Sequence, residues 1–147
     1  MISLPTYLRI VRFSAWYDLI VTAGFATPWT FPLILANLET LSALLGISGS
    51  FPRFEPTHML MANLLGSIVT VWAVLRLCAT QAVFGRFDAA GRFLFATWQL
   101  YALAHNAHPI IWGFFAIEVA LGIAQILPVA LVGPVKNAGS RNEEVHS

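Results

Sequence analysis

The sequence predicts an all-α integral membrane protein, a four-helix bundle with both termini in the cytoplasm. Hydrophobic residues make up 58 % of the 147 residues, and the mean hydropathy is +0.74. Charged residues make up only 10 %, whereas a soluble domain carries roughly 25 %. Four apolar stretches each approach the roughly 20 residues that a bilayer-spanning helix needs. This composition argues against a water-soluble globule and a disordered chain, and the net charge of +1 argues against a nucleic-acid-binding surface.

The four apolar stretches cover residues 7–27, 57–78, 89–107 and 109–132, and with their connections they form one predicted membrane domain, residues 1–134. The second stretch has the most continuous apolar sequence. Asp18, inside the first stretch, argues against a cleaved signal peptide. Residues 135–147 are polar and are predicted to form a C-terminal tail outside the bundle.

A further helix is expected between the first two spans, over residues 33–46. Ile34, Leu38, Leu41 and Leu45 recur at spacings of four, three and four, which is typical of one apolar helical face. The segment is too short to cross a bilayer easily. We therefore expect an interfacial or re-entrant helix, and a helix that packs over the mouth of the bundle fits the pattern equally well.

The distribution of positive charge predicts the orientation, because Lys and Arg concentrate in short cytoplasmic loops. With the amino terminus inside, four spans place seven of the eight cations on the cytoplasmic side and one, Arg53, outside. The predicted location is a cell membrane, with the bacterial inner membrane favoured. The cytoplasmic set is Arg9, Arg12, Arg76, Arg86, Arg92, Lys136 and Arg141.

Two acidic residues lie inside predicted spans, Asp18 near the middle of the first and Glu118 near the middle of the fourth. A carboxylate at the centre of a bilayer costs several kcal/mol, about 2.5–3.5 on insertion scales, so such residues are candidates for function. If the two acids face one cavity, they can share a proton. A role that only fixes the packing of the helices is the alternative. The predicted ligand-binding set adds neighbouring polar and aromatic side chains: Asn63, Gln99, Trp16 and Trp98.

Three histidines, His58, His105 and His108, are expected at the outer end of the bundle. Imidazoles are ligands for zinc and copper, and a pair can hold haem between helices, so these residues are candidates for a divalent metal or haem. Interfacial residues with one hydrated edge are the alternative. Pro109 restricts His108 to an extended conformation, which works against a helical ligand pair.

The number and placement of the spans resemble small bacterial four-helix membrane proteins of the DoxX-like type. The sequence segments DLIVTAGFATPW (18–29) and NLLGSIVTVWAVLRL (63–77) look like motifs, but no activity attaches to them. Some members of that group accompany quinone-linked oxidoreductases, so the resemblance implies a membrane location and a possible link to quinones, and it implies no functional residue.

The sequence leads to one preferred function and two alternatives. The preferred function is a non-enzymatic binding or accessory subunit that holds a small amphipathic ligand, a quinone or a lipid, in a pocket within the membrane. The first alternative is a proton-coupled or metal-ion transporter that uses the acid pair. The second is a haem-bearing redox subunit. A homo-oligomer or a larger membrane complex is compatible with all three, and no catalytic motif such as GxSxG or a Walker loop occurs in the sequence.

Overall fold

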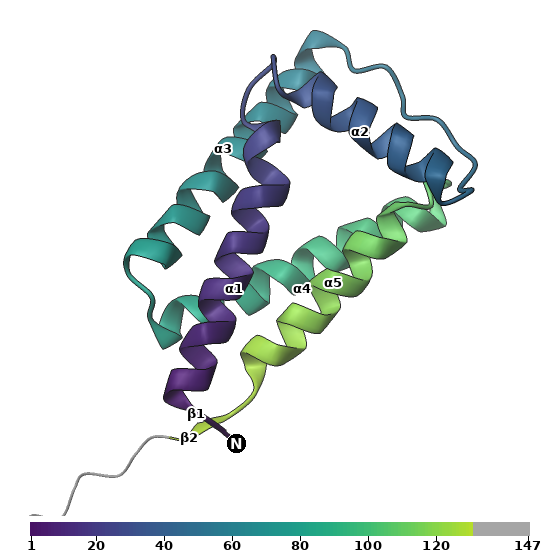
Figure 1. Cartoon of the computed structure of the whole chain (residues 1–147). Helices are drawn as coiled ribbons and strands as arrows, with labels where there is room; N and C mark the ends of the chain where they lie inside the picture. The colour runs from purple at the N-terminus through teal and green to yellow at the C-terminus, as the bar shows by residue number, and fades with distance from the viewer. Residues whose placement is uncertain (131–147) are drawn as a thin grey trace, which may run out of the picture.

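The computed structural model describes residues 1–130, and this part of the chain is helical apart from its two ends and its connections (Figure 1). The all-α prediction is confirmed at this level. Two-residue strands at the ends, β1 and β2, pair in parallel, with Ile2 opposite Val129. The elements are β1 (Ile2–Ser3), α1 (Leu4–Thr22), the short 3₁₀ helix η1 (Ala23–Phe25), α2 (Phe31–Leu44), α3 (Pro56–Cys78), α4 (Ala82–Ala104), α5 (Ile111–Ile126) and β2 (Val129–Ala130).

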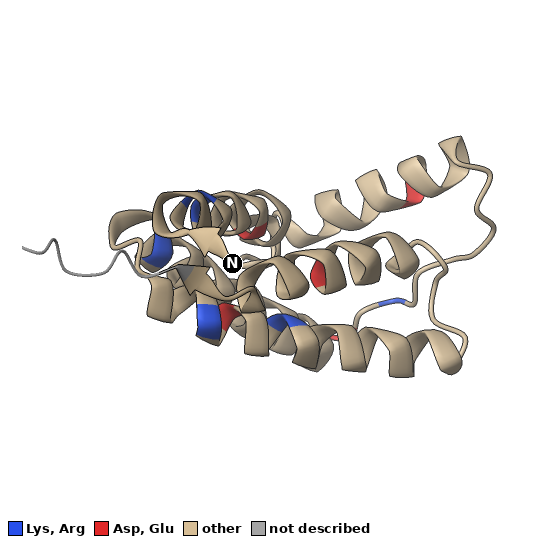
Figure 2. Ribbon diagram, turned by 90° about the horizontal axis from the view of Figure 1, so that it is seen from below, with Lys and Arg blue, Asp and Glu red and all other residues tan. Residues whose placement is uncertain are grey.

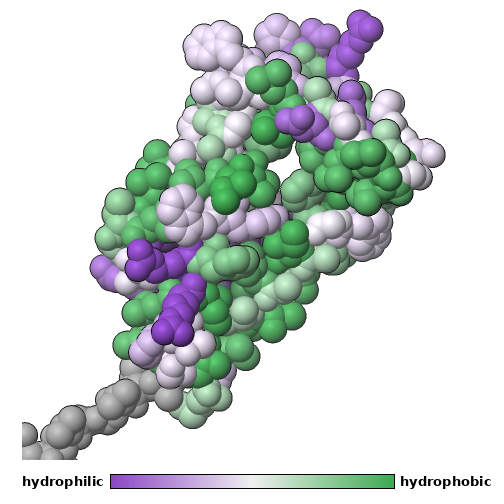
Figure 3. Space-filling model, viewed as in Figure 1, coloured by the Kyte–Doolittle hydropathy of each residue, from purple (hydrophilic) through white to green (hydrophobic). Residues whose placement is uncertain are grey.

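The four long helices form two pairs, α1 with α3 and α4 with α5, that meet near the chain ends and spread apart at the opposite end (Figure 1). Helix α2 bridges the two pairs where they are spread. A space-filling view shows an opening through the molecule between α1, α2 and the α4–α5 pair (Figure 3). Because β1 lies beside β2, residues 1–3 and 129–130 are at the same end of the bundle, as four antiparallel helices require.

The observed bounds differ most from the expected ones at α4, which corresponds to the third predicted span. Helix α3 begins and ends within one residue of the predicted 57–78. Helix α4 begins at Ala82, seven residues before the predicted start, and so includes Asp88 and Arg92 in its first half. Helix α5 is shorter than expected and ends at Ile126. The predicted tail, residues 135–147, lies outside the described residues.

Helix α2 occupies the predicted position between the first two long helices, and its inward face matches the predicted one in part. Its buried residues are Phe31 and Ser42; of the predicted apolar face Ile34 and Leu38 are half-buried, whereas Leu41 and Leu45 are exposed. The connection after α2 also packs against the start of this helix, where Phe54 contacts Phe31 edge to face at 4.8 Å between ring centroids. Apolar spacing alone does not indicate which side such a loop will cover.

Two glycines allow close approach between elements. A Cβ at Gly85 of α4 would overlap Val11 and the Tyr7 hydroxyl of α1, and Tyr7 is fixed there by donating a hydrogen bond of 2.8 Å to the Gln125 carbonyl oxygen. A Cβ at Gly66 of α3 would overlap the backbone of η1 at Phe25. These contacts set how closely α1 approaches α4 and how η1 rests on α3.

Burial in this bundle is partly reversed relative to that in a soluble protein, because polar and charged residues are as numerous in its interior as apolar ones. The largest fully buried side chain is Arg76, and Asp18, Asp88, Arg92 and Glu118 are also buried. Large apolar side chains instead cover the outward faces of every long helix, and hydrophilic patches gather toward the two ends of the molecule (Figure 3). Examples of exposed residues on α3 are Leu60, Met61, Leu64, Leu65, Ile68, Val71 and Val74.

Among residues 1–130, α3 is the one helix that is both long enough and apolar enough to cross a membrane by composition. Only 17 % of its apolar stretch is buried inside the structure. Helices α2 and α5 are apolar but shorter.

Replacing Gly85 by Leu should destabilise the protein by about 1–3 kcal/mol, because the new side chain overpacks the contact between α1 and α4. Gly113→Leu is the matched control, since a Cβ at Gly113 meets no atom within 4 Å. Thermal unfolding followed by circular dichroism measures both variants. Equal midpoints for the two would contradict the close approach at Gly85.

Candidate functional site

The candidate site is a buried network of charged and polar side chains to which each of the four long helices contributes two residues. In three helices the two residues are four apart, and in α5 they are seven apart, so each pair lies on one helical face. The network consists of Ser14 and Asp18 on α1, Trp72 and Arg76 on α3, Asp88 and Arg92 on α4, and Glu118 and Gln125 on α5.

Asp88 is the acceptor with the most partners. Its Oδ1 accepts a hydrogen bond of 3.0 Å from Trp72 Nε1, and its Oδ2 accepts bonds of 2.7 Å from both Ser14 Oγ and Gln125 Nε2. The same Oδ2 pairs with Arg76 Nη1 and, at 3.2 Å, with Arg92 Nε. One carboxylate therefore joins all four long helices.

The two arginines connect Asp18 and Glu118 to the same network. Arg76 Nη2 pairs with Asp18 Oδ2, and Arg92 Nη2 lies 2.7 Å from Asp18 Oδ1. Arg92 Nη1 lies 2.7 Å from Glu118 Oε2. Asp18 and Glu118 thus converge on one guanidinium, which lies between them as their common partner.

The charges in this network do not balance. Two guanidinium groups, Arg76 and Arg92, face three carboxylates, so the fully ionised network carries a formal charge of −1. All five groups are buried. Uncompensated charge is costly in a medium of low dielectric constant, so a proton or an added cation is needed for neutrality.

A hollow of about 160 Å³ lies beside the network, between α3 and α4. Asp18, Asp88, Arg92 and Glu118 form its polar side. Ile68 of α3 and Phe87 of α4, also in its lining, are 63 % and 65 % exposed, so the hollow opens on the apolar flank of the bundle. The remaining lining residues are Val69, Trp72, Gly91 and Phe95.

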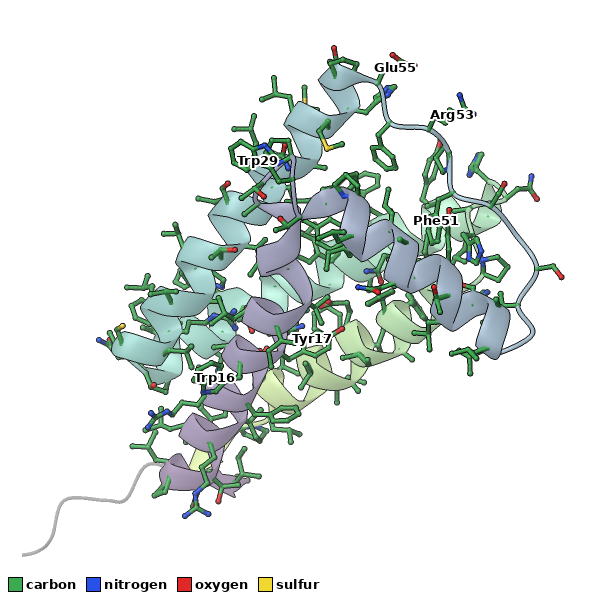
Figure 4. All side chains as sticks on the ribbon, turned by 45° about the horizontal axis from the view of Figure 1, so that its top comes forward. Trp16, Tyr17, Trp29, Phe51, Arg53 and Glu55 are labelled. Atoms are coloured by element: carbon green, nitrogen blue, oxygen red, sulfur yellow. The ribbon has the colours of Figure 1, made fainter. Side chains whose placement is uncertain are left out.

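Two of the six predicted ligand-binding residues line the hollow. Asp18 and Glu118 line the same hollow. The other four do not line it. Asn63 Nδ2 instead donates a bond of 2.7 Å to the Phe25 carbonyl oxygen, and Gln99 Oε1 is buried without a partner. Trp16 and Trp98 are exposed on outward helix faces, and Trp16 lies on the opposite side of α1 from Tyr17 (Figure 4).

Within residues 1–130 the predicted histidines form no metal-binding group, and no set of three or more His, Cys, Asp or Glu side chains is arranged for one. His108 is buried, stacks on Phe51 at 4.5 Å between ring centroids, and accepts a hydrogen bond at Nδ1 from the Ile110 amide. His105 Nδ1 lies 2.8 Å from the Tyr101 carbonyl oxygen, and His58 is exposed. Because His108 is buried against the loop that carries Phe51, its imidazole does not face the other two histidines.

Arg76 and Asp88 are the network members that the sequence did not suggest. Arg76 and Arg92 were counted among the cytoplasmic-side cations, and Asp88 falls one residue before the predicted third span, residues 89–107. The structure buries both arginines in the bundle, since Arg76 is 0 % exposed and Arg92 is 2 % exposed. The four-residue spacing of Asp88 and Arg92 was the available signal, because it predicts an ion pair on one helical face once the helix begins before residue 88.

No protein-family model, curated protein or solved structure matches the chain.

Replacing Asp88 by Leu should cost about 3–5 kcal/mol of stability, since it leaves both buried arginines short of a partner and removes the acceptor of Trp72 and Gln125. Glu39→Leu, on the exposed face of α2, is the control and should change stability by at most about 0.5 kcal/mol. Thermal unfolding of the purified variants measures the difference. Indistinguishable midpoints would show that Asp88 does not hold the helices together.

Proposed function

We propose that the chain is a multi-pass membrane protein, that its four long helices cross the bilayer, and that the hollow between α3 and α4 receives the head of a small amphipathic ligand. The observation that carries the membrane proposal is the reversed burial: charged side chains fill the centre and large apolar side chains cover the outside. Soluble monomers rarely expose continuous apolar surface on this scale. In a bilayer the same surface meets lipid tails and its exposure costs nothing.

The exposure of α3 supports this proposal. The core helix of a soluble protein also passes a test of length and apolarity, but such a helix is mostly buried, whereas the apolar stretch of α3 is 17 % buried. Its exposed residues occur on several sides of the helix, including Leu64, Leu65 and Ile68. A helix with this composition and exposure is suited to contact with lipid.

Helices α1 and α4 carry more charge than a typical span, and the network accounts for the buried charges, while Arg9, Arg12 and Arg86 are exposed near one end of the bundle. Asp18, Asp88 and Arg92 all have partners of opposite charge on neighbouring helices. Ionisable residues within membranes are tolerated where they face the bundle interior and pair with one another. Helix α5, 16 residues and about 24 Å long, is somewhat shorter than the hydrocarbon core, a mismatch that local thinning accommodates.

The proposed orientation depends on the exposed cations, since Arg76 and Arg92 belong to the interior. Arg9 and Arg12 lie in the first half of α1 and Arg86 near the start of α4, at the end of the bundle that holds the amino terminus. Arg53 lies on the connection between α2 and α3 at the opposite end (Figure 4). Most basic segments of the ribbon accordingly lie toward the amino-terminal end (Figure 2). Among the exposed cations of residues 1–130, three against one still favour a cytoplasmic location for the chain ends.

The proposed ligand is a lipid or a quinone-like amphiphile bound through its head. A hollow of about 160 Å³ is too small for a drug-sized molecule, for which pockets of about 300–1,000 Å³ are usual. Its polar side lies at the network, and its mouth opens between Ile68 and Phe87. A head group can therefore enter while an apolar tail remains in the surrounding lipid. The corresponding role is that of a binding or accessory subunit.

Proton-coupled transport is the second candidate, because Asp18 and Glu118 line one hollow and share Arg92. Ligand-dependent proton flux into liposomes that is lost in both Asp18→Asn and Glu118→Gln would favour it over the binding role.

Cysteine labelling should place the two ends of the bundle on opposite sides of the membrane. In a Cys78→Ser background, Ser50→Cys should react with a membrane-impermeant maleimide in intact spheroplasts, and Gln81→Cys should react only after permeabilisation. Both positions are exposed in connections, at opposite ends of α3. Labelling of both, or of neither, in intact spheroplasts would contradict a chain that crosses the bilayer in this way.

Gly91→Leu should remove the ligand without unfolding the protein. Gly91 lines the hollow, and a Cβ there meets no atom within 4 Å, so a leucine fits the structure and occupies the space. Gly113→Leu is again the matched control, since Gly113 is equally open and does not line the hollow. Native mass spectrometry of protein released from membranes should show a bound amphiphile in the wild type and control that is absent in Gly91→Leu. Identical spectra for all three proteins would reject the hollow as the binding site.

A further inference from the structure

We infer that the head group received by the hollow is cationic, an alkylammonium, rather than a carbonyl or an anion. This inference rests on the proposed binding function of the hollow and specifies its ligand. It is drawn from three properties of the lining: the hydrogen-bonding capacity that remains, the charge, and the aromatic walls.

Most donors at the polar side of the hollow are already used. Arg92 donates from Nε to Asp88, from Nη1 to Glu118 and from Nη2 to Ser14 and Asp18, so one of its five N–H groups, on Nη1, is left. Trp72 Nε1 donates to Asp88. A quinone carbonyl or a carboxylate brings only acceptors, and beyond that one N–H it would compete with these bonds for the same protons.

Acceptor capacity remains at the same place. Glu118 accepts one side-chain hydrogen bond, from Arg92 to Oε2, and its second oxygen has none. A carboxylate has about four acceptor positions on its two oxygens. An ammonium group, which is a donor only, therefore finds a partner at Glu118 that an acceptor-only head group does not.

The charge and the walls favour the same class of ligand. A single positive charge brings the three carboxylates and two guanidinium groups of the network to neutrality. Trp72, Phe87 and Phe95 supply aromatic side chains to the lining, and aromatic faces attract cations. A hollow of about 160 Å³ is of a size for an ammonium head rather than for a whole amphiphile.

Equilibrium dialysis of the full chain in dodecyl maltoside, with protein-free micelles as the blank, tests this inference. The probes are hexylammonium, hexanol and hexanoate, which share one tail, together with decylubiquinone. We expect one hexylammonium per protein, bound about tenfold or more tightly than any other probe. Added phosphatidylethanolamine, compared with phosphatidylglycerol, distinguishes the sources: displacement by the former identifies a lipid head group, and its failure to displace identifies a free amine.

Two variants test whether the charged network and the aromatic walls of the hollow provide the selectivity for a cation. Glu118→Gln keeps an acceptor for Arg92 but removes one charge, so it should weaken hexylammonium binding about tenfold, whereas Glu39→Gln on α2 should not change it. Phe95→Leu, which alters no hydrogen bond, should weaken binding of hexylammonium but not of hexanol. Circular dichroism and the unfolding midpoint verify that each variant is folded.

The outcomes separate failure of this inference from failure of the proposed function. If hexanol, hexanoate or decylubiquinone binds as tightly as hexylammonium and Gly91→Leu abolishes that binding, the inference is wrong and the hollow remains a ligand site. If no probe binds saturably and native mass spectrometry finds no ligand dependent on Gly91, both are wrong. Equal effects of Glu118→Gln and Glu39→Gln would also overturn the cationic head group.

Discussion

The bundle depends on the pairing of two buried guanidinium groups with three carboxylates supplied by three of its helices. Arg92 bridges Asp18 and Glu118, and Asp88 accepts hydrogen bonds from side chains of α1, α3 and α5 as well as of its own helix. Buried ion pairs do not necessarily stabilise a fold more than apolar residues would, but removal of one partner is strongly destabilising. Once these charges are inside, the four helices are therefore constrained to an arrangement that gives each charged group a partner of opposite sign.

This constraint explains why the bundle is closed at one end and open at the other. The network lies toward the ends of the chain, where Tyr7 also joins α1 to the Gln125 carbonyl and Gly85 permits close contact. Beyond it the pairs α1–α3 and α4–α5 separate (Figure 1). At the open end, α2 and the following connection are attached by aromatic contacts, Phe54 to Phe31 and Phe51 to His108.

The same network that holds the helices together also produces the chemistry of the hollow. Most of the arginine and tryptophan donors at the hollow are used in bonds to the network itself, whereas Glu118 keeps an oxygen without a hydrogen bond, so most of the capacity left toward the hollow belongs to carboxylates. Because α3 and α4 diverge there, the hollow reaches the apolar flank of the molecule between Ile68 and Phe87. A charged centre with lateral access is the arrangement that our proposals for ligand class and binding route require.

The amino-acid sequence was enough to predict that the chain is helical, where most helices lie, and that Asp18 and Glu118 are unusual, because apolar runs and isolated charges are local properties of the chain. The fold was needed to show that Arg76, Asp88 and Arg92 are buried in one network with them, that Gln99 and Asn63 do not line the hollow, and that His108 is covered by Phe51. These outcomes depend on which helical faces meet and on where α4 begins. The spacing of residues within one helix does not indicate how that helix is rotated relative to its neighbours. Contacts between residues of different helices could therefore be found only in the folded structure.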